Sequence, residues 1–510
     1  MSDSPISRRY FFFGAALAGA VPAAGFGSTP SLKALGYKSP NEKLNLAAIG
    51  AGGQPASDLR TAHAGIENVV ALADVDWTRG QDSFKRFPDA VKYKDFRQML
   101  DKHGKDIDAV IVGPPDHMHA TCALACMQLG KHIYVEKPLT RTSWEARFLW
   151  QAAERYKVAT QMGNQGYSHD ATRVAAEIIW SGEIGDVTEV HAWTGRPSWP
   201  QGMAEVAATS PVPGTLDWDL WLGGAAARPF TAGDSVYKEF VTTRNARYGR
   251  TGGDNFGFYL PFNWRGFYDF GSSLIGDWGV HILGPANWAL QLGPEYLRSV
   301  ECVKKDSLPA FTFPDVLTIK YEFGPRPGMP PVTIYWYHHG AGDAYLPPGM
   351  TADEARKLPG QGPQVGPVAP TGRPAPNRPV QASGYNEIFV GSKGYLGTSG
   401  RGEGVGLLPG ARWAEYKLPA PYLSRSPGAS TGSNHAAHCR DWVRACKGGA
   451  PACSNFSIAA KYTEWLVLGA ASVHVEGKLL WDNRKGEFTN SREANKWVKP
   501  VFRKGWELKL

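Results

Sequence analysis

The chain has 510 residues, enough for two to four domains, and its 43% hydrophobic and 20% charged residues are ordinary for a globular protein. The formal net charge is +8, but Lys and Arg form no basic block, which argues against a nucleic-acid partner. None of the six cysteines forms a CxxC pair, which argues against a zinc knuckle, and a disulfide framework is not expected in a chain of this length.

The first thirty residues have the composition of an export signal. Residues 7–12, Ser-Arg-Arg-Tyr-Phe-Phe, are similar to the start of a twin-arginine signal, and a mild apolar run rich in Gly and Ala follows to residue 26. This run is too short and too weakly apolar for a stable membrane span. We therefore expect residues 1–30 to engage the twin-arginine export machinery, residues 31–43 to form a polar linker, and the protein to be periplasmic or exported.

Residues 44–76 have the pattern of a dinucleotide-binding unit. An apolar run at 44–49 predicts a strand, a turn with Gly50, Gly52 and Gly53 follows, and a second strand is predicted at 69–73 after a helical stretch. Glycines at such a turn let the backbone approach a pyrophosphate, and the helix N-terminus behind the turn offers free N–H groups. We expect this turn to bind the phosphates of a dinucleotide cofactor.

The acid at the end of the second predicted strand indicates which dinucleotide is bound. Asp74 stands roughly 20 residues beyond the turn, where a carboxylate accepts a hydrogen bond from a ribose 2′-hydroxyl. The same carboxylate repels a 2′-phosphate, so NAD is expected in preference to NADP, although Arg79 could soften that preference. Pro55 stands where a third glycine is usual, and its ring is bulkier against the strand.

The next part of the sequence predicts further alternation of strands and helices. Three more strands are predicted, at residues 107–112, 131–135 and 158–163. Because the carboxyl ends of parallel strands line one crevice, the glycine turn, Asp74, the loop with Pro115 and His119, and Lys137 should meet there. A helix is predicted from about residue 120 to 129, which leaves His117 and His119 in the loop before it, where we expect them to pack on the cofactor.

Lys137 is placed at a sharp corner directly after a predicted strand. Pro138 fixes its own φ and moves Lys137 out of the helical region, and the bond between them could be cis. One interpretation is that Lys137 projects its ammonium group into a substrate pocket. The alternative is a solvated Lys-Pro turn at the surface, and these residues alone do not decide between the two.

From about residue 187 the pattern changes to short apolar runs between loops rich in Trp and Pro. Strand-like runs are predicted at 188–192, 215–221 and 332–337, and helices at 170–181, 434–447 and 458–475. Residues 340–385 are rich in Gly and Pro and have no periodicity, so an extended excursion is expected there. The tail from residue 481 to 510 is expected to wrap back as a loop with a short helix.

Two patterns that contain histidine, both in the second half of the chain, are candidates for a catalytic or a metal-binding site. Asp277 and His281 are four residues apart, so a helix places both on one face, where an acid orients an imidazole that acts as a base. The alternative is a helix N-terminal acid beside a packed histidine. His435 and His438 could bind a metal, but the sequence around them offers no acid or Cys set, so packing or substrate contact is preferred and no metal site is expected.

Four motifs together resemble the Gfo/Idh/MocA oxidoreductase family, named for glucose–fructose oxidoreductase and inositol dehydrogenase. They are Glu136-Lys137-Pro138, residues 115–119, Gly163-Asn164-Gln165-Gly166, and Gly276-Asp277-Trp278-Gly279-Val280-His281. The resemblance runs from about residue 43 to the C-terminus and is nearest to the exported bacterial branch with a twin-arginine signal and a long second domain. Pro55 is the departure from the family pattern.

The resemblance implies an α/β fold with an N-terminal Rossmann dinucleotide-binding domain, at 44–165, and a C-terminal α/β domain with a large open, mostly antiparallel sheet, at 166–480. It implies homo-oligomerisation through that sheet. The implied catalytic residues are Lys137, Asp277 and His281, with Trp264 and Arg265 expected beside them in the substrate pocket. The implied cofactor-binding residues are Gly50, Gly52, Gly53, Asp74, Pro115, His119, Glu136, Lys137, Asn164 and Gln165.

The expected function is an NAD(P)-dependent oxidoreductase that acts on a hydroxyl of a sugar, glycoside or cyclitol and keeps its cofactor bound. In this interpretation His281 takes the hydroxyl proton and Lys137 stabilises the alkoxide. One alternative is a glycosidase that uses bound NAD for transient oxidation without net redox change. A second is a non-catalytic sugar-binding protein, against which the intact Lys137, Asp277 and His281 argue.

Overall fold

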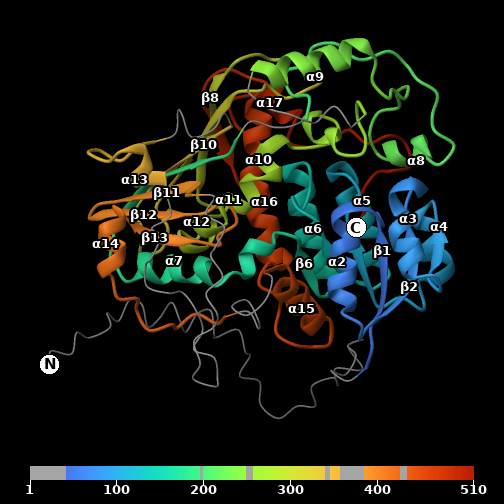
Figure 1. Ribbon diagram of the computed structural model, residues 1–510, viewed down its shortest axis with the longest axis horizontal. Coiled ribbons are helices and arrows are strands. Elements are labelled where there is room, and N and C mark those ends of the chain that lie inside the picture. The colour runs from blue at the N-terminus through green and yellow to red at the C-terminus, as the bar shows by residue number, and fades with distance from the viewer. Residues whose placement is uncertain (1–41, 196–198, 248–256, 339–344, 357–383, 426–433) are drawn as a thin grey trace.

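The computed structural model describes residues 42–195, 199–247, 257–338, 345–356, 384–425 and 434–510 (Figure 1). The expected export signal at 1–30 and the linker at 31–43, apart from its last two residues, lie outside these ranges, as does most of the excursion expected at 340–385. Within the described ranges, no helix has the length and apolar character that crossing a membrane requires.

The first domain is built on a six-stranded sheet in which every neighbouring pair is parallel, in the order β3-β2-β1-β4-β5-β6. Its strands are β1 (Asn45–Ile49), β2 (Asn68–Ala73), β3 (Val91–Tyr93), β4 (Ala109–Val112), β5 (His132–Val135) and β6 (Thr160–Met162). Its helices are α2 (Gly53–His63), α3 (Trp77–Arg86), α4 (Phe96–His103), α5 (Asp116–Gln128) and α6 (Ser143–Tyr156). The order reverses at β1 and β4, which is the crevice where a doubly wound fold binds its ligand.

Both faces of this sheet are buried, as a parallel sheet requires. Along β4, Val110 and Val112 face one apolar cluster, and Ala109 and Ile111 face the other. The second cluster includes Trp442 of α15 (Asn434–Cys446), so a helix from the end of the chain covers one face of the first domain. The two halves of the sequence are therefore joined in one packed unit.

The second sheet has nine strands in the order β13-β12-β11-β7-β10-β9-β8-β14-β15. Its strands are β7 (Val187–Trp193), β8 (Leu297–Lys305), β9 (Leu317–Phe323), β10 (Val332–Tyr337), β11 (Glu387–Gly391), β12 (Gly394–Thr398), β13 (Val405–Leu408), β14 (Leu479–Asp482) and β15 (Glu487–Phe488). Its pairs are antiparallel except for β10 with β7. The expected large, mostly antiparallel sheet is confirmed, and so are the strands predicted at 188–192 and 332–337.

Helices pack against the inner side of this sheet, and the long α16 (Phe456–Ser472) also packs on α6 of the first domain. Tyr321 of β9 donates from its hydroxyl to the Leu466 carbonyl at 2.7 Å, which fixes α16 on the sheet. The remaining helices of the second half are α7 (Asp170–Trp180), α8 (Trp218–Leu222), α9 (Ser235–Arg247), α10 (Ser273–Asp277), α11 (Gly279–Ile282), α12 (Gly284–Ala289), α13 (Ala352–Arg356), α14 (Gly410–Glu415) and α17 (Arg492–Asn495). Two 3₁₀ turns lie at Gln165–Ser168 and Asn263–Gly266.

Two local predictions were wrong, and the tail has one strand more than expected. The strand expected at 215–221 is a turn followed by α8, because the Asp217 carboxylate caps the helix by accepting from the Leu220 N–H at 3.0 Å. The helix expected from residue 120 begins at Asp116, so His117 and His119 lie in its first turn rather than in a loop. The tail contributes β15 at the edge of the second sheet in addition to the short α17.

The C-terminal tail returns to the first domain (Figure 1). The side-chain amide of Gln128, at the end of α5, donates to the Lys509 carbonyl at 2.8 Å. The Arg503 N–H donates to the Gly224 carbonyl just beyond α8 at 2.9 Å. The last residues are therefore tied both to the first domain and to the α8 segment.

Candidate active site

The glycine turn after β1 forms a tight corner against the loop after β4. Gly50 has a φ of +82°, and a Cβ at this position would lie 2.9 Å from the Gly113 carbonyl group. Helix α2 begins at Gly53 without a side-chain cap and without an acid in its first turn. The N–H groups at this helix end are therefore available to an anionic ligand, as the sequence predicted.

The proline that departs from the usual glycine pattern has a compensating partner. A Cβ on Gly113 would lie 2.0 Å from the Cγ atom of Pro55, so the proline ring fills the space that a side chain would take on the strand side. The close approach of helix and strand is preserved because the small residue stands on the loop after β4 instead of on α2. Pro55 therefore leaves the corner intact.

A cleft of about 390 Å³ opens at this corner, at the carboxyl ends of the parallel strands. It brings together most of the side chains and turns that the sequence predicted for cofactor and substrate. The predicted residues that line it are Gly50, Gly52, Gly53, Asp74, Pro115, His119, Glu136, Lys137, Trp264 and Arg265. Asn164, Gln165, Asp277 and His281 are not among its described lining residues.

Asp74 lies at one end of the cleft and is held by the backbone. Its carboxylate accepts from the Ala51 N–H at 2.8 Å and from the Asp76 N–H at 2.9 Å. Burial raises the pKa of Asp74 to about 6, although these two hydrogen bonds act in the opposite direction. Each carboxylate oxygen keeps a further lone pair, so Asp74 can still accept from a ligand hydroxyl.

Lys137 lies at the other end, where it joins residues far apart in the sequence. Its Nζ atom is 2.5 Å from Asp277 Oδ1, and Arg265 Nε is 3.1 Å from the same oxygen. Burial alone would raise the pKa of Asp277, but the two cations outweigh it and hold that pKa well below its usual range. The Lys137–Pro138 bond is cis, as the sequence allowed, and the partly buried ion pair excludes a solvated surface turn.

Arg265 is fixed by two aromatic rings as well as by Asp277. Its guanidinium carbon lies 4.1 Å from the Phe262 ring centroid and 4.2 Å from that of Trp264. Arg265 also donates to the Phe262 carbonyl at 3.2 Å. Asp277 therefore holds two cations at the wall of the cleft, and both side chains are oriented by contacts of their own.

His281 is close to this ion pair, but it does not share one continuous helix with Asp277, as the sequence predicted it would. Asp277 ends α10 and His281 lies in α11, and the Asp277 carboxylate contacts Lys137 and Arg265. Burial and then the charge of Lys137 lower the pKa of His281 well below its usual value. Its Nδ1 atom is buried with no hydrogen-bond partner among the described residues. The imidazole is therefore neutral, and the positive charge of Lys137 helps to keep it so.

Asp116 is a lining acid that sequence reasoning missed. Its carboxylate accepts from the Ser272 hydroxyl at 3.0 Å, and burial raises the pKa of Asp116 to about 7 against the opposing charge of Arg265. The signal that could have identified it was its place directly after Pro115, at the mouth of the predicted crevice. An acid that titrates near neutrality in a cleft is a candidate for proton exchange.

Glu136, Asn164 and Gln165 lie together at the side of Lys137. The Gln165 amide donates to Glu136 Oε1 at 3.3 Å, and the Lys137 N–H donates to Glu136 Oε2 at 3.2 Å. Burial and then the carboxyl of Asp58 raise the pKa of Glu136 well above its usual range. Both polar atoms of the Asn164 side chain are buried without a partner among the described residues.

The two histidines at the start of α5 have different roles. His119 lines the cleft, and its ring nitrogens lie 2.9 Å from the Pro138 carbonyl and 2.8 Å from the Pro114 carbonyl. His117 is packed instead between the rings of Trp221 and Phe270, and burial lowers its pKa to about 3. His119 is therefore part of the cleft wall, whereas His117 is a packing residue.

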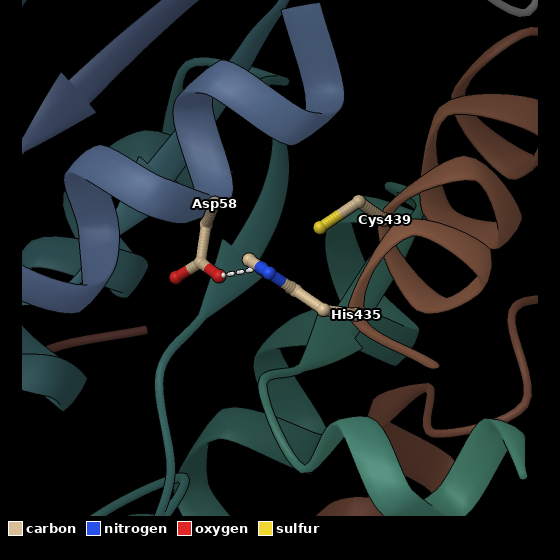
Figure 2. A group of neighbouring side chains, drawn as sticks. All are labelled: Asp58, His435 and Cys439. Atoms are coloured by element: carbon tan, nitrogen blue, oxygen red, sulfur yellow. Dashed lines mark hydrogen bonds and ion pairs between the residues drawn. The ribbon is translucent and has the colours of Figure 1, made fainter. Parts of the chain in front are cut away.

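The expectation that no acid or cysteine accompanies His435 was wrong. Figure 2 shows Asp58 of α2 facing His435 and Cys439 of α15, and the candidate ligand atoms lie within 4.8 Å of one another. An acid and a cysteine therefore do accompany this histidine, although they are 377 and 4 positions away in the sequence. His435 Nε2 lies 2.5 Å from Asp58 Oδ1, so a hydrogen bond links the two helices, while burial lowers the pKa of His435 and raises that of Asp58 to about 7.

His438 is a packing residue, as expected. Its ring nitrogens lie 2.6 Å from the Ser168 hydroxyl and 2.7 Å from the Met162 carbonyl. Burial lowers the pKa of His438 to about 4. This neutral ring joins α15 to the end of β6 and the turn that follows it.

The comparisons with known proteins agree with this geometry. Residues 44–164 match the Gfo/Idh/MocA family, described as an oxidoreductase family with an NAD-binding Rossmann fold. Levoglucosan dehydrogenase of Pseudarthrobacter phenanthrenivorans is 28% identical over 140 residues, which are 26% of this chain and 35% of that protein. Inositol 2-dehydrogenase 1 of Saccharopolyspora erythraea is 31% identical over 154 residues, 29% of this chain and 44% of that protein.

The similarity in sequence thus spans less than half of these relatives, but the similarity in structure is wider. An inositol dehydrogenase homologue from Azotobacter vinelandii, solved with NADH and myo-inositol, has a TM-score of 0.53 at 15% identity, covering 88% of this chain and 100% of that one. This likeness shows that the two-domain fold is shared. Residues 44–164 thus match the NAD-binding domain of the Gfo/Idh/MocA oxidoreductase family.

Proposed function

We propose that this protein is an NAD(P)-dependent oxidoreductase that acts on a hydroxyl of a sugar, glycoside or cyclitol and keeps its cofactor tightly bound. The observation that carries the proposal is the single cleft that joins the glycine corner and Asp74 at one end to Lys137 and Arg265 at the other. Relatives named for levoglucosan and inositol oxidation support the substrate class.

The residues around the cleft fit a nicotinamide dinucleotide. The uncapped N-terminus of α2 suits a pyrophosphate, and the glycines of the turn before it line the cleft. Asp74 would bind the adenosine ribose and disfavour a 2′-phosphate, so we propose NAD as the preferred cofactor. Arg79 and Lys94 also line this end and would reduce the preference without reversing it.

Lys137 and His281 have complementary roles in the proposed reaction. A bound nicotinamide would accept hydride from the substrate carbon. Lys137 would hold the substrate oxygen and stabilise the negative charge that grows on it as the proton leaves. His281, kept neutral by burial and by Lys137, would receive that proton, and Asp277 would keep Lys137 in place.

Identification of the nucleotide in the purified protein tests the proposal first. Denaturation should release about one nicotinamide dinucleotide per chain, and a panel of sugars and cyclitols added to the intact protein should change its nicotinamide absorbance. The same panel with aryl glycosides tests the glycosidase alternative, because release of aglycone without net change in nicotinamide would identify that reaction. Protein that neither contains nor binds a nicotinamide nucleotide would exclude the oxidoreductase.

We also propose that the protein is exported and forms a homo-oligomer. The Arg8-Arg9 pair before an apolar run supports export through the twin-arginine machinery, and a fusion of residues 1–43 to a reporter tests it. The second sheet supports assembly, because along β10 the buried Val332, Ile334 and Trp336 alternate with Thr333, Tyr335 and Tyr337, which are only half-buried. Sedimentation analysis should give a mass larger than one chain.

A further inference from the structure

Two segments from outside the first domain line the cleft that contains Asp74. Beside Asp74 and Arg79, its lining includes Trp221 of α8 and Trp506 of the C-terminal tail. In a dinucleotide-binding unit, the acid after the second strand marks the adenosine half of the cofactor. Trp506 lies on this side of the cleft, because its ring packs on Arg97 of α4, next to the lining residues Lys94, Asp95 and Phe96 that follow β3.

The α8 segment is attached to the first domain by its backbone. Leu216 forms an antiparallel bridge with Asp76, two residues beyond Asp74, and both acids line the cleft. The Trp77 N–H donates to the Thr215 carbonyl at 3.1 Å, and the Asp217 N–H donates to the Val75 carbonyl at 2.9 Å. These bonds hold the segment across the loop that follows β2.

The tail is fixed to this segment and to the first domain. Arg503 pairs with Asp219 of α8 at 2.5 Å. Trp506 is 8% exposed, and the Arg97 guanidinium lies 4.4 Å from its ring centroid. The Arg503 guanidinium lies 5.9 Å from the same centroid. Because these two cations hold the indole while the ring still lines the cleft, Trp506 presents a rigid aromatic surface to whatever occupies this end.

We propose that Trp506 is an adenine-binding residue and that the tail, joined to the α8 segment through Arg503, retains the adenosine half of the cofactor. This inference rests on the proposed function and adds to it the part of the chain that slows cofactor release. An adenine ring is flat and stacks on aromatic side chains, which suits the indole. The tail must separate from Asp219 and Arg97 before this end of the cleft opens.

The test measures release of NADH from the loaded protein after addition of excess NAD, followed by nicotinamide fluorescence. Trp506→Ala should release NADH about tenfold to a hundredfold faster, as expected for the loss of one base–aromatic stack. Trp506→Phe should stay near the wild type because it keeps an aromatic ring. Arg503→Ala removes the side-chain tie between the tail and Asp219 and one cation beside the indole, so it should also release NADH faster.

Val501→Ala is the matched control, since this residue lies in the same tail and is 91% exposed. ADP-ribose, which has only the adenosine half, should lose affinity in Trp506→Ala by the same factor as NADH, whereas reduced nicotinamide mononucleotide should not. Wild-type release rates in both Trp506→Ala and Arg503→Ala, with NADH still bound, would overturn the inference alone. A wild-type protein that binds neither NADH nor ADP-ribose would overturn the proposed function and the inference with it.

Discussion

Replacement of Asp277 by Asn removes the charge that holds two cations at the cleft wall. The Asp277 side chain is 8% exposed, and its partners Lys137 and Arg265 are 15% and 19% exposed, so the group is largely shielded from water. Removing one partner of a buried ion pair costs roughly 3–5 kcal/mol, because the charge left behind is uncompensated. Since two cations would remain side by side, we expect Asp277→Asn to lower the free energy of unfolding by about 4 kcal/mol at pH 7.

The dependence on pH distinguishes this effect from lost packing. The pKa of Asp277 is lowered in the folded protein, so its stabilisation is complete above the unfolded value of 3.8 and is lost as the pH falls through the folded value. The difference between wild type and Asp277→Asn should therefore be constant from pH 7 to pH 5 and should shrink only below about pH 4.

Urea unfolding followed by tryptophan fluorescence measures this difference. Glu493→Gln is the control, because Glu493 pairs with Lys496 at the surface, with side chains 56% and 69% exposed, where a pair is worth about 0.2–1 kcal/mol. An Asp277→Asn variant as stable as this control, or one whose deficit disappears between pH 7 and pH 5, would refute the role given to Asp277.

Three further predictions concern the proposed hydride transfer and the packing of Gly113 against Pro55. Lys137→Met should lower kcat by roughly a hundredfold or more while the nucleotide stays bound; stopped-flow nicotinamide absorbance checks this, and wild-type turnover would contradict it. His281→Ala should lower kcat by about 10²–10⁴-fold at unchanged nucleotide content; a loss in KM alone would show that the imidazole only shapes the pocket. Gly113→Ala should destabilise the protein by roughly 1–3 kcal/mol through its clash with Pro55, and Pro55→Ala should recover part of that loss in the double variant; additive losses in urea unfolding would show that the two residues do not pack against each other.

Much of the first domain could be predicted from its sequence, because its signals are local. Continuous apolar runs, a glycine turn and an acid at fixed spacing specify a buried parallel strand and its loop without reference to the rest of the chain. A strand was predicted at 215–221 because Leu216, Trp218 and Leu220 alternate with polar residues, as apolar residues do in a strand with one buried face. The Asp217 cap and the contacts of the tryptophans decided for a helix.

The partners within the site could not be predicted in the same way. Lys137 meets Asp277 across 140 positions, and Asp58 meets His435 across 377. Such pairs depend on how α10 and α15 pack against the first domain, and the residues themselves carry no signal of it. The expected acid–histidine pair followed helical spacing, but Asp277 is bound more strongly by two cations than by a neutral imidazole.

Single-turnover reduction of the bound nucleotide tests the joint role of the cleft and Lys137 most directly. Protein carrying one oxidised nicotinamide dinucleotide is mixed with each sugar and cyclitol of the panel, and the absorbance of reduced nicotinamide is recorded for the wild type and for Lys137→Met. We expect rapid reduction in the wild type with at least one polyol and a large loss of rate in the variant. A wild-type nucleotide that stays oxidised with every polyol, or equal rates in both proteins, would contradict hydride transfer beside Lys137.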